Sequence, residues 1–232
     1  TLAQNERKSN FKGDEFHWFG AVSKHSKITK ATHVVLQAIM KIKLFPLNLV
    51  AFPSKLIPLH IFENRYKKMI NDCIDEKKDF GIVYQNTKTQ SKIGCSASVE
   101  KIINKYPDGR MDIIAKGRKI FKVEGQAQLD DLAIGDIKYM SDIKPLSTDN
   151  FNPLLDKYIK LLLAVGFKDN LDHHLNKTLT FELLEMIQTS HNFELELLRL
   201  KSEEERAKIL DSFFTSILKQ SEIFKPDGGY QS

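Results

Sequence analysis

The sequence predicts an α+β fold, in which a β-rich N-terminal part with one packed helix precedes a C-terminal helical bundle. Three observations support this prediction. Residues 80–143 contain short apolar stretches separated by glycine turns. This pattern is typical of a small barrel or a two-layer β unit. Apolar residues from Tyr66 to Ile74 recur with the period of a helix. After Pro145 the apolar period is again helical.

The segment 43–74 organises the β-rich part. It opens with two apolar pieces, residues 44–47 and 49–52, and Pro53 and Pro58 divide it into stretches that are too short for a helix. Because proline fixes φ and has no N–H to donate, each apolar piece is expected to form an edge strand or the start of one. The amphipathic helix that follows is expected to pack on these strands.

The rest of the β-rich part is expected to contain a polar loop at 85–92 and strands over residues 80–84, 93–106, 111–116, 120–124 and 137–143. Asp108 and Gly109 supply the positive-φ positions that a tight hairpin turn needs. Gly117 and Arg118 are expected to interrupt the strand that follows this turn.

Four helices are predicted after residue 145. In the first, Asn152 is expected to cap the N-terminus, Pro153 suits the first helical position, and Gly166 is placed to end the helix. The second and third helices are expected over residues 179–187 and 193–200.

The fourth helix has the clearest start signal. Ser202 and Glu205 have the spacing of a capping box, in which the serine caps the helix and the glutamate reaches back. Its apolar face runs over residues 209–218. Residues 225–232 are expected to be a flexible tail, because they hold a proline and two glycines.

Composition excludes several classes of protein. The 232 residues are 41% hydrophobic and 28% charged, as in an ordinary soluble globular protein. No apolar run approaches the ~20 residues that a membrane span needs, and no signal-peptide pattern is present. Cys73 and Cys95 lie far apart, outside any CxxC pair, which favours a reduced, cytoplasmic protein. Cys73 falls on the apolar helix face and is expected to be buried.

Residues 1–39 differ from the rest. They are polar, keep no apolar period, and supply +3 of the formal net charge of +5. We expect Met40 to begin the folded domain and residues 1–39 to be an extension, disordered or not native to the fold. A short aromatic docking motif around Trp18 is the alternative. The basic balance gives weak support at best to nucleic-acid binding.

A long signature surrounds the prolines, and further motifs follow it in order. They are Phe45-Pro46-Leu47, Phe52-Pro53, Pro58-Leu59-His60-Ile61-Phe62-Glu63, Arg65-Tyr66, Phe80-Gly81-Ile82-Val83, Ile93-Gly94-Cys95, Pro107-Asp108-Gly109-Arg110 and Gly117-Arg118. This pattern resembles the Lon protease N-terminal domain family, also called the Lon substrate-binding domain, which also occurs as a stand-alone protein. The resemblance covers about residues 43–220.

The resemblance implies a PUA-like pseudo-barrel with the first helix packed against it, and it divides the domain into a β-rich lobe at 40–145 and a helical lobe at 146–224. Residues 194–198 and 203–210 resemble the C-terminal helical element of the family. The sequence departs there, because Asn192-Phe193 stands where a Lys-Gln pair often occurs in the family. The resemblance therefore supports the helix and no family role for those side chains.

Catalytic signals are weak. The chain has no GxxxxGK[ST] motif for a triphosphate and no segment like the Ser-Lys protease module of Lon. His173 and His174 are adjacent, so they are expected to point apart as solvent-facing loop residues and to hold no metal. His60 is expected to be a packed histidine that is hydrogen-bonded to backbone, in preference to a general base. We therefore expect no catalytic residues, no metal and no cofactor.

The resemblance implies a non-catalytic module that binds unfolded or misfolded polypeptides and could act as an adaptor for a protease or unfoldase in protein quality control. Apolar or basic residues near strand edges and loops are the candidate contacts: Leu56, Ile57, Tyr84, Tyr106 and Arg118. RNA binding is the alternative, by analogy with PUA-like folds and from the lysines and arginines between residues 101 and 122. Fold analogy alone carries no function, so RNA is the weaker prediction. A hydrolase is weaker still.

Overall fold

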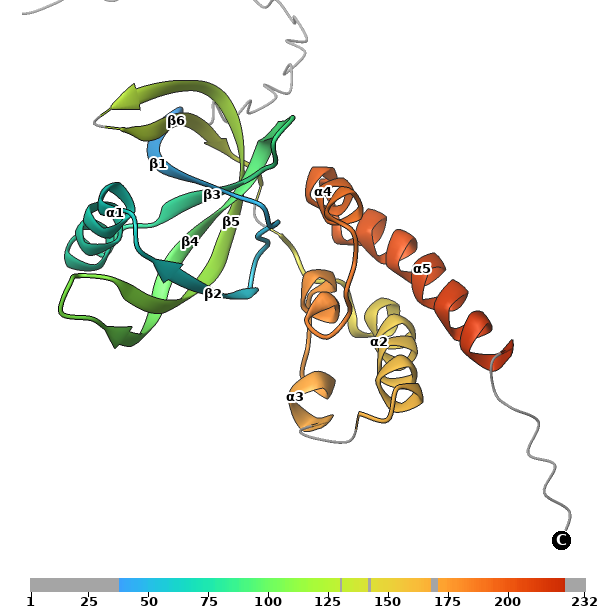
Figure 1. The fold of residues 1–232 in the computed structure, drawn as a ribbon. Coiled ribbons are helices and arrows are strands. Elements are labelled where there is room, and N and C mark those ends of the chain that lie inside the picture. The colour runs from blue at the N-terminus through green and yellow to red at the C-terminus, as the bar shows by residue number, and fades with distance from the viewer. Residues whose placement is uncertain (1–37, 130, 142, 168–170, 224–232) are drawn as a thin grey trace, which may run out of the picture. The chain divides into compact units, whose positions relative to one another are not determined.

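The computed structural model describes residues 38–129, 131–141, 143–167 and 171–223 (Figure 1). The predictions for the tail at 225–232, and for nearly all of the extension at 1–39, fall outside these residues. Within the described ranges, no helix combines the length and the apolar character that crossing a bilayer requires.

Six strands form a single sheet in the first half of the described chain. They are β1 (Met40–Leu47), β2 (Leu56–Ile61), β3 (Phe80–Gln85), β4 (Gln90–Lys105), β5 (Met111–Leu129) and β6 (Leu132–Tyr139). The order is β2-β5-β4-β3-β1-β6, and β5 also pairs with β6, so the sheet closes into a ring close to a barrel (Figure 1). β1 and β3 are parallel, and the other pairs are antiparallel. We call this part the β lobe.

One helix, α1 (Asn64–Asp75), packs on the β lobe, and the remaining helices form the helical lobe. The helical lobe contains α2 (Thr148–Ala164), α3 (Leu171–Leu175), the 3₁₀ helix η1 (Thr180–Leu184), α4 (His191–Arg199) and α5 (Glu203–Ile223). The predicted α+β fold, with a β-rich part before a helical part, is confirmed. As predicted, Tyr66, Met69, Ile70 and Cys73 form the buried face of α1.

Gly117 does not interrupt a strand, contrary to the prediction. β5, which is 19 residues long, continues through Gly117 without a break. A Cβ atom on Gly117 would lie 2.1 Å from the carbonyl oxygen of Phe52, so this position needs a glycine because another backbone segment approaches closely. The Gly117 N–H donates to Lys55 O at 2.9 Å, and the Ser54 N–H donates to Gly117 O at 3.0 Å. The connection between β1 and β2 is thus fastened to the middle of β5.

The second apolar piece, residues 49–52, is not a strand, which corrects the prediction. Val50, Ala51 and Phe52 are buried in a connection, and the strand begins later, at Leu56. β2 has the edge position expected of a segment with a proline, since among the described strands it pairs with β5 alone, with Pro58 opposite Ile114. Exposed and buried residues alternate strictly along β2.

The predicted hairpin turn after β4 is confirmed, with one difference. The Gly109 N–H donates to Tyr106 O at 2.9 Å, and the Tyr106 N–H donates to Arg110 O at 2.9 Å. Gly109 has a φ of 84°, whereas Asp108 is not among the described residues with positive φ. Asp108 instead accepts a hydrogen bond from the Arg110 N–H at 3.1 Å through its side chain.

Several helix starts differ from the prediction. α2 begins at Thr148, so Asn152 and Pro153 lie inside it; burial of Phe151 extends the apolar face towards the N-terminus. Gly166 ends α2 as predicted, with a φ of 80°. The second predicted helix is only the short 3₁₀ helix η1, and α3 was not predicted. α4 begins two residues early because Ser190 caps it, accepting from the Phe193 N–H at 3.3 Å.

The predicted cap of α5 is present. The Ser202 hydroxyl accepts from the Glu205 N–H at 3.2 Å. Glu205 reaches back one residue further than a capping box requires, to the Lys201 N–H at 3.2 Å. The apolar residues of α5 then pack on those of α2 and η1 in the core of the helical lobe.

The core of the helical lobe includes residues from the β lobe. Val50, Phe52 and Ile120 pack with the helices, and the Phe52 ring stacks on Phe181 with centroids 5.4 Å apart. The remaining buried residues of the β lobe form two separate clusters. The connection between β1 and β2, together with Ile120 on β5, therefore helps to join the lobes.

Both cysteines are buried free thiols, as was expected for Cys73. Burial raises the pKa of Cys73 to about 11 and that of Cys95 to about 12. Because the thiolate is the reactive form, we expect neither thiol to react with a disulfide reagent within minutes at pH 8. Both should react at once in guanidinium chloride. Stoichiometric labelling of the native protein on the same timescale would contradict the burial of both thiols.

Candidate functional site

An open pocket of about 530 Å³ lies where the ends of β1 and β2 meet the start of α1 and the β5–β6 hairpin. Many of its lining residues belong to the signature that carries the family resemblance. They include Phe45, Pro46, Leu47, Leu59, His60, Ile61, Phe62, Glu63, Arg65 and Tyr66. The proline-rich signature therefore shapes one side of a single pocket.

The pocket combines apolar residues with amide groups. Tyr66 stacks on Phe45 with ring centroids 4.1 Å apart, which fixes one apolar wall. Three glutamines contribute to the lining: Gln85, Gln126 and Gln128. Each glutamine amide can both donate and accept hydrogen bonds. These three glutamines, which we call the amide rim, therefore suit the backbone of a peptide of any sequence.

Arg65 closes the α1 side of this pocket. Its guanidinium pairs with Glu63 at 2.8 Å and donates to the carbonyl oxygen of Asp131 at 3.2 Å. The arginine thus joins the start of α1 to the β5–β6 hairpin, and its charge is already matched by a neighbouring carboxylate.

His60 is exposed and bonded to a side chain, so the predicted packed histidine with a backbone partner is wrong. Its Nδ1 lies 2.6 Å from Asp112 Oδ1, and the Tyr106 hydroxyl donates to Asp112 Oδ2 at 2.7 Å. The hydrogen bond from His60, and then that from Tyr106, lowers the pKa of Asp112. The described lining of the pocket holds no serine, threonine, cysteine or lysine.

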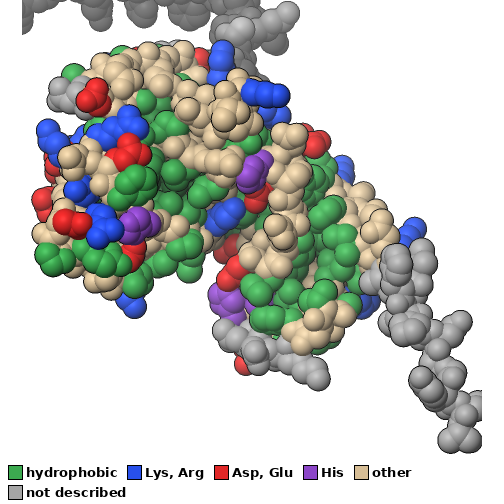
Figure 2. All heavy atoms as spheres, in the orientation of Figure 1, with side chains coloured by type: hydrophobic (Ala, Val, Ile, Leu, Met, Phe, Trp, Pro, Cys, Tyr) green, Lys and Arg blue, Asp and Glu red, His purple; other side chains and the backbone are tan. Residues whose placement is uncertain are grey.

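An apolar surface adjoins the pocket along β2. Leu56 is 56% exposed and Phe62 is 59% exposed, and the Phe62 ring stacks on His60 with centroids 5.9 Å apart. Figure 2 shows hydrophobic side chains at the surface of the β lobe in the region of β2, interspersed with charged ones. We call Leu56, Pro58, His60 and Phe62 the β2 face.

The structure separates the five predicted contact residues. Leu56 lies on the β2 face, but the Ile57 side chain is only 2% exposed and belongs to the core of the β lobe. Tyr84 packs towards the helical lobe, with its ring 4.9 Å from that of His191. Tyr106 stands beside His60, and Arg118 lines a different pocket on β5. These residues therefore do not form one surface.

Sequence reasoning missed Phe62 and His60 as surface residues. Both belong to the signature, and a strand period counted from Leu56 places residues 56, 58, 60 and 62 on one side. That period was overlooked because Pro53 and Pro58 were taken only as breaks between stretches too short for a helix, whereas Pro58 lies inside an edge strand.

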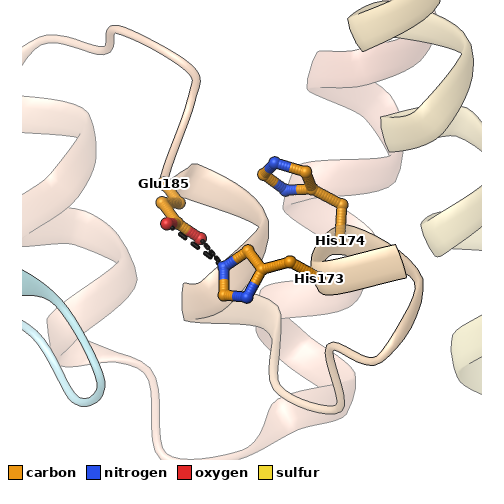
Figure 3. A group of neighbouring side chains, drawn as sticks. All are labelled: His173, His174 and Glu185. Atoms are coloured by element: carbon orange, nitrogen blue, oxygen red, sulfur yellow. Dashed lines mark hydrogen bonds and ion pairs between the residues drawn. The ribbon is translucent and has the colours of Figure 1, made fainter. Parts of the chain in front are cut away.

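A second cluster of polar side chains joins α3 to η1 (Figure 3). Ligand atoms of His173, His174 and Glu185 lie within 4.8 Å of one another, so the adjacent histidines do not simply point apart. His173 Nε2 lies 3.0 Å from a Glu185 oxygen. His174 is buried, not solvent-facing, with Nδ1 2.9 Å from the Tyr158 hydroxyl, and burial lowers its pKa.

The positive charge beside the Glu185 carboxylate comes from a lysine of the protein. The ammonium group of Lys177, whose side chain is buried, contacts the same Glu185 oxygen as His173. The lysine therefore pairs with the carboxylate of the cluster. The cluster acts as a polar connection between α3 and η1.

Residues 41–218 match the family described as the ATP-dependent protease La (LON) substrate-binding domain. The chain is 28% identical over 127 residues to the Lon protease of Flavobacterium johnsoniae, covering 51% of this chain and 15% of that protein. It is 30% identical over 139 residues to the Lon protease of Parabacteroides distasonis, covering 54% and 17% respectively. The chain thus spans a small part of the length of these relatives.

Solved structures share the fold. The Lon N-terminal domain protein from Xanthomonas campestris matches with a TM-score of 0.58 and 22% identity, covering 81% of this chain and 100% of that chain. The N-terminal domain of Mycobacterium avium complex Lon protease matches with a TM-score of 0.62 and 10% identity, covering 76% and 98%. At these identities the likeness concerns the fold alone.

Proposed function

The chain belongs to the family of ATP-dependent protease La (Lon) substrate-binding domains, and from this membership we propose that it binds unfolded polypeptides through the β2 face and the pocket beside it. The proposed role of these residues is that of a polypeptide-binding module. In this role it would present bound chains to a protease or unfoldase, as an adaptor in protein quality control.

The observation that carries this proposal is the exposure of Leu56 and Phe62 along one side of β2, with Phe62 in the lining of an open pocket that also holds three glutamines. Apolar side chains of an unfolded chain gain about 25 cal/mol for each Å² of apolar surface that they bury. The glutamines can hydrogen-bond any peptide backbone, so recognition is expected to be tolerant of sequence. A folded protein hides both its apolar side chains and its backbone groups, and it should bind poorly.

Replacing Phe62 by Ser tests the proposal. We expect the affinity for a permanently unfolded polypeptide, such as reduced and carboxymethylated lactalbumin, to fall about three- to tenfold, because a hot-spot aromatic contact contributes ~1 kcal/mol or more. Fluorescence anisotropy of the labelled polypeptide measures this affinity. The side chain is exposed, so the change should leave the stability of the protein nearly unaltered.

The matched control is Val165→Ser, because Val165 is 79% exposed at the end of α2 in the helical lobe. This control should retain the affinity of the original protein within a factor of two. Equal weakening by both substitutions would show that binding does not depend on the β2 face. Absence of binding above that of an inert protein would remove the proposed function itself.

A further inference from the structure

We propose that the protein has a second binding site, a basic groove where β5 and β6 face the helical lobe, and that this groove takes an extended acidic segment of a polypeptide. Two adjoining pockets of about 540 and 520 Å³ form it. They share Ile120, Met140, Ser141 and Ile143, so they are parts of one continuous depression. None of its lining residues lines the pocket beside the β2 face.

Cationic side chains line both pockets of the basic groove. β5 contributes Lys116, Arg118, Lys119 and Lys122, and β6 contributes Lys138. The helical lobe adds Arg199 and Lys201 on the opposite side. Cations thus stand on both sides of the groove, which is the arrangement that a ligand with several negative charges requires.

Three of these cations have no matching carboxylate among the described residues. Among the described lining residues, the carboxylates are Asp79 and Glu124. Asp79 accepts a hydrogen bond from the Ser96 hydroxyl at 2.9 Å, and Glu124 pairs with Lys122 at 3.3 Å. Within the described part of the chain, Arg118, Lys138 and Arg199 form no ion pair. An acidic ligand can therefore pair with them without breaking existing ion pairs.

The floor of the basic groove distinguishes a polypeptide from RNA. It is aliphatic, with Ile93, Ile120, Met140, Ile143 and Leu200 in the lining. Tyr139 is the only aromatic residue in the described lining, and its ring meets Phe121 edge-on at 6.5 Å. Single-stranded RNA is recognised by stacking its bases on aromatic rings. An extended peptide that alternates acidic and apolar side chains instead fits both the cationic rim and the aliphatic floor.

The test uses a labelled peptide that alternates Glu with Leu or Val, and a matched peptide in which Gln replaces every Glu. Fluorescence anisotropy with the full chain should show that the acidic peptide binds at least about tenfold more tightly at low salt, and that salt reduces this difference. Equal affinity for the two peptides, or no binding of the acidic peptide, would overturn the proposal.

The variant with Arg118→Gln and Arg199→Gln locates the site. It should bind the acidic peptide about five- to tenfold more weakly, since each exposed charge contact contributes modestly. The matched control, Lys68→Gln with Lys88→Gln, removes the same charge from exposed positions outside the groove and should bind within about twofold of the original. Equal weakening by the two pairs of substitutions would show a general effect of charge and would contradict binding of the peptide in the basic groove.

Two further binding measurements distinguish peptide binding in the basic groove from binding at the β2 face and from binding of RNA. Phe62→Ser should leave binding of the acidic peptide unchanged, even though it weakens binding of the unfolded polypeptide, so the two proposals can fail independently. A labelled oligouridine should bind more weakly than the acidic peptide and should not displace it at equal concentration. Tighter binding of the oligouridine, with displacement of the peptide, would assign the groove to RNA and overturn the proposal.

Discussion

Replacing Arg206 by Ala should destabilise the protein by about 3–5 kcal/mol, because it leaves the Glu203 carboxylate buried without its cation. The side chains of Arg206 and Glu203 are 1% and 0% exposed. Arg206 donates from Nε and Nη2 to Glu203 Oε1, at 3.2 and 2.9 Å, and from Nη1 to the carbonyl oxygen of Leu200 at 2.8 Å. Glu203 Oε2 accepts from the Thr180 N–H at 2.9 Å. The pair therefore joins α5 to η1 and to the turn before α5.

Guanidinium chloride denaturation followed by circular dichroism measures this effect. Exposed Lys208, also on α5, provides the control, because Lys208→Ala should change the free energy of unfolding by less than about 0.5 kcal/mol. The double variant Glu203→Gln with Arg206→Met should be more stable than Arg206→Ala, since it removes both charges and keeps much of the buried volume. A loss of less than about 1 kcal/mol in Arg206→Ala would show that the carboxylate reaches water.

Gly117→Ala should reduce the free energy of unfolding by about 3 kcal/mol, at the upper end of the range for overpacked sites. The added Cβ would lie 2.1 Å from the Phe52 carbonyl oxygen, and backbone cannot move aside as a flexible side chain can. The displacement would also disturb the hydrogen bonds of Gly117 with Ser54 and Lys55. Because Phe52 stacks on Phe181, the contact between the lobes should loosen as well.

Gly125 on the same strand is the matched control. A Cβ there would meet only the side chain of Asp136, whose Oδ2 lies 3.3 Å away. Gly125→Ala should therefore change the stability by less than about 1 kcal/mol. Thermal denaturation of the two variants compares them directly. Similar melting temperatures would show that the connection at Phe52 moves aside at little cost.

Much of the fold could be predicted because its elements follow local periods. The face of α1, the turn at Gly109 and the cap at Ser202 each depend on residues close in sequence, and each is confirmed. The role of Gly117 could not be predicted in this way. Position 117 requires glycine because the backbone of Phe52, 65 positions earlier in the chain, approaches it closely. The start of α2 was also missed, because burial of Phe151 depends on packing with other helices.

The candidate site was less predictable than the fold. Pro58 indicated only that its segment is too short for a helix, and the pairing of β2 with β5 shows that residues 56–61 form a strand that exposes Leu56 and His60. The hydrogen bond between His60 and Asp112 joins residues 52 positions apart. The basic groove likewise combines β5 with Arg199, so a scan of local charge finds the lysines of β5 without their counterpart.

The position of Phe52 limits how the domain can be dissected. Val50, Phe52 and Ile120 belong by sequence to the β lobe, yet they are buried among the helices. A fragment that stops near residue 145 would carry these side chains bare into solvent, where they would promote aggregation. The fragment with only the helices would in turn leave Phe181 without its stacking partner. The strands and the helices are therefore one unit for expression and for grafting, although the sequence divides them so clearly.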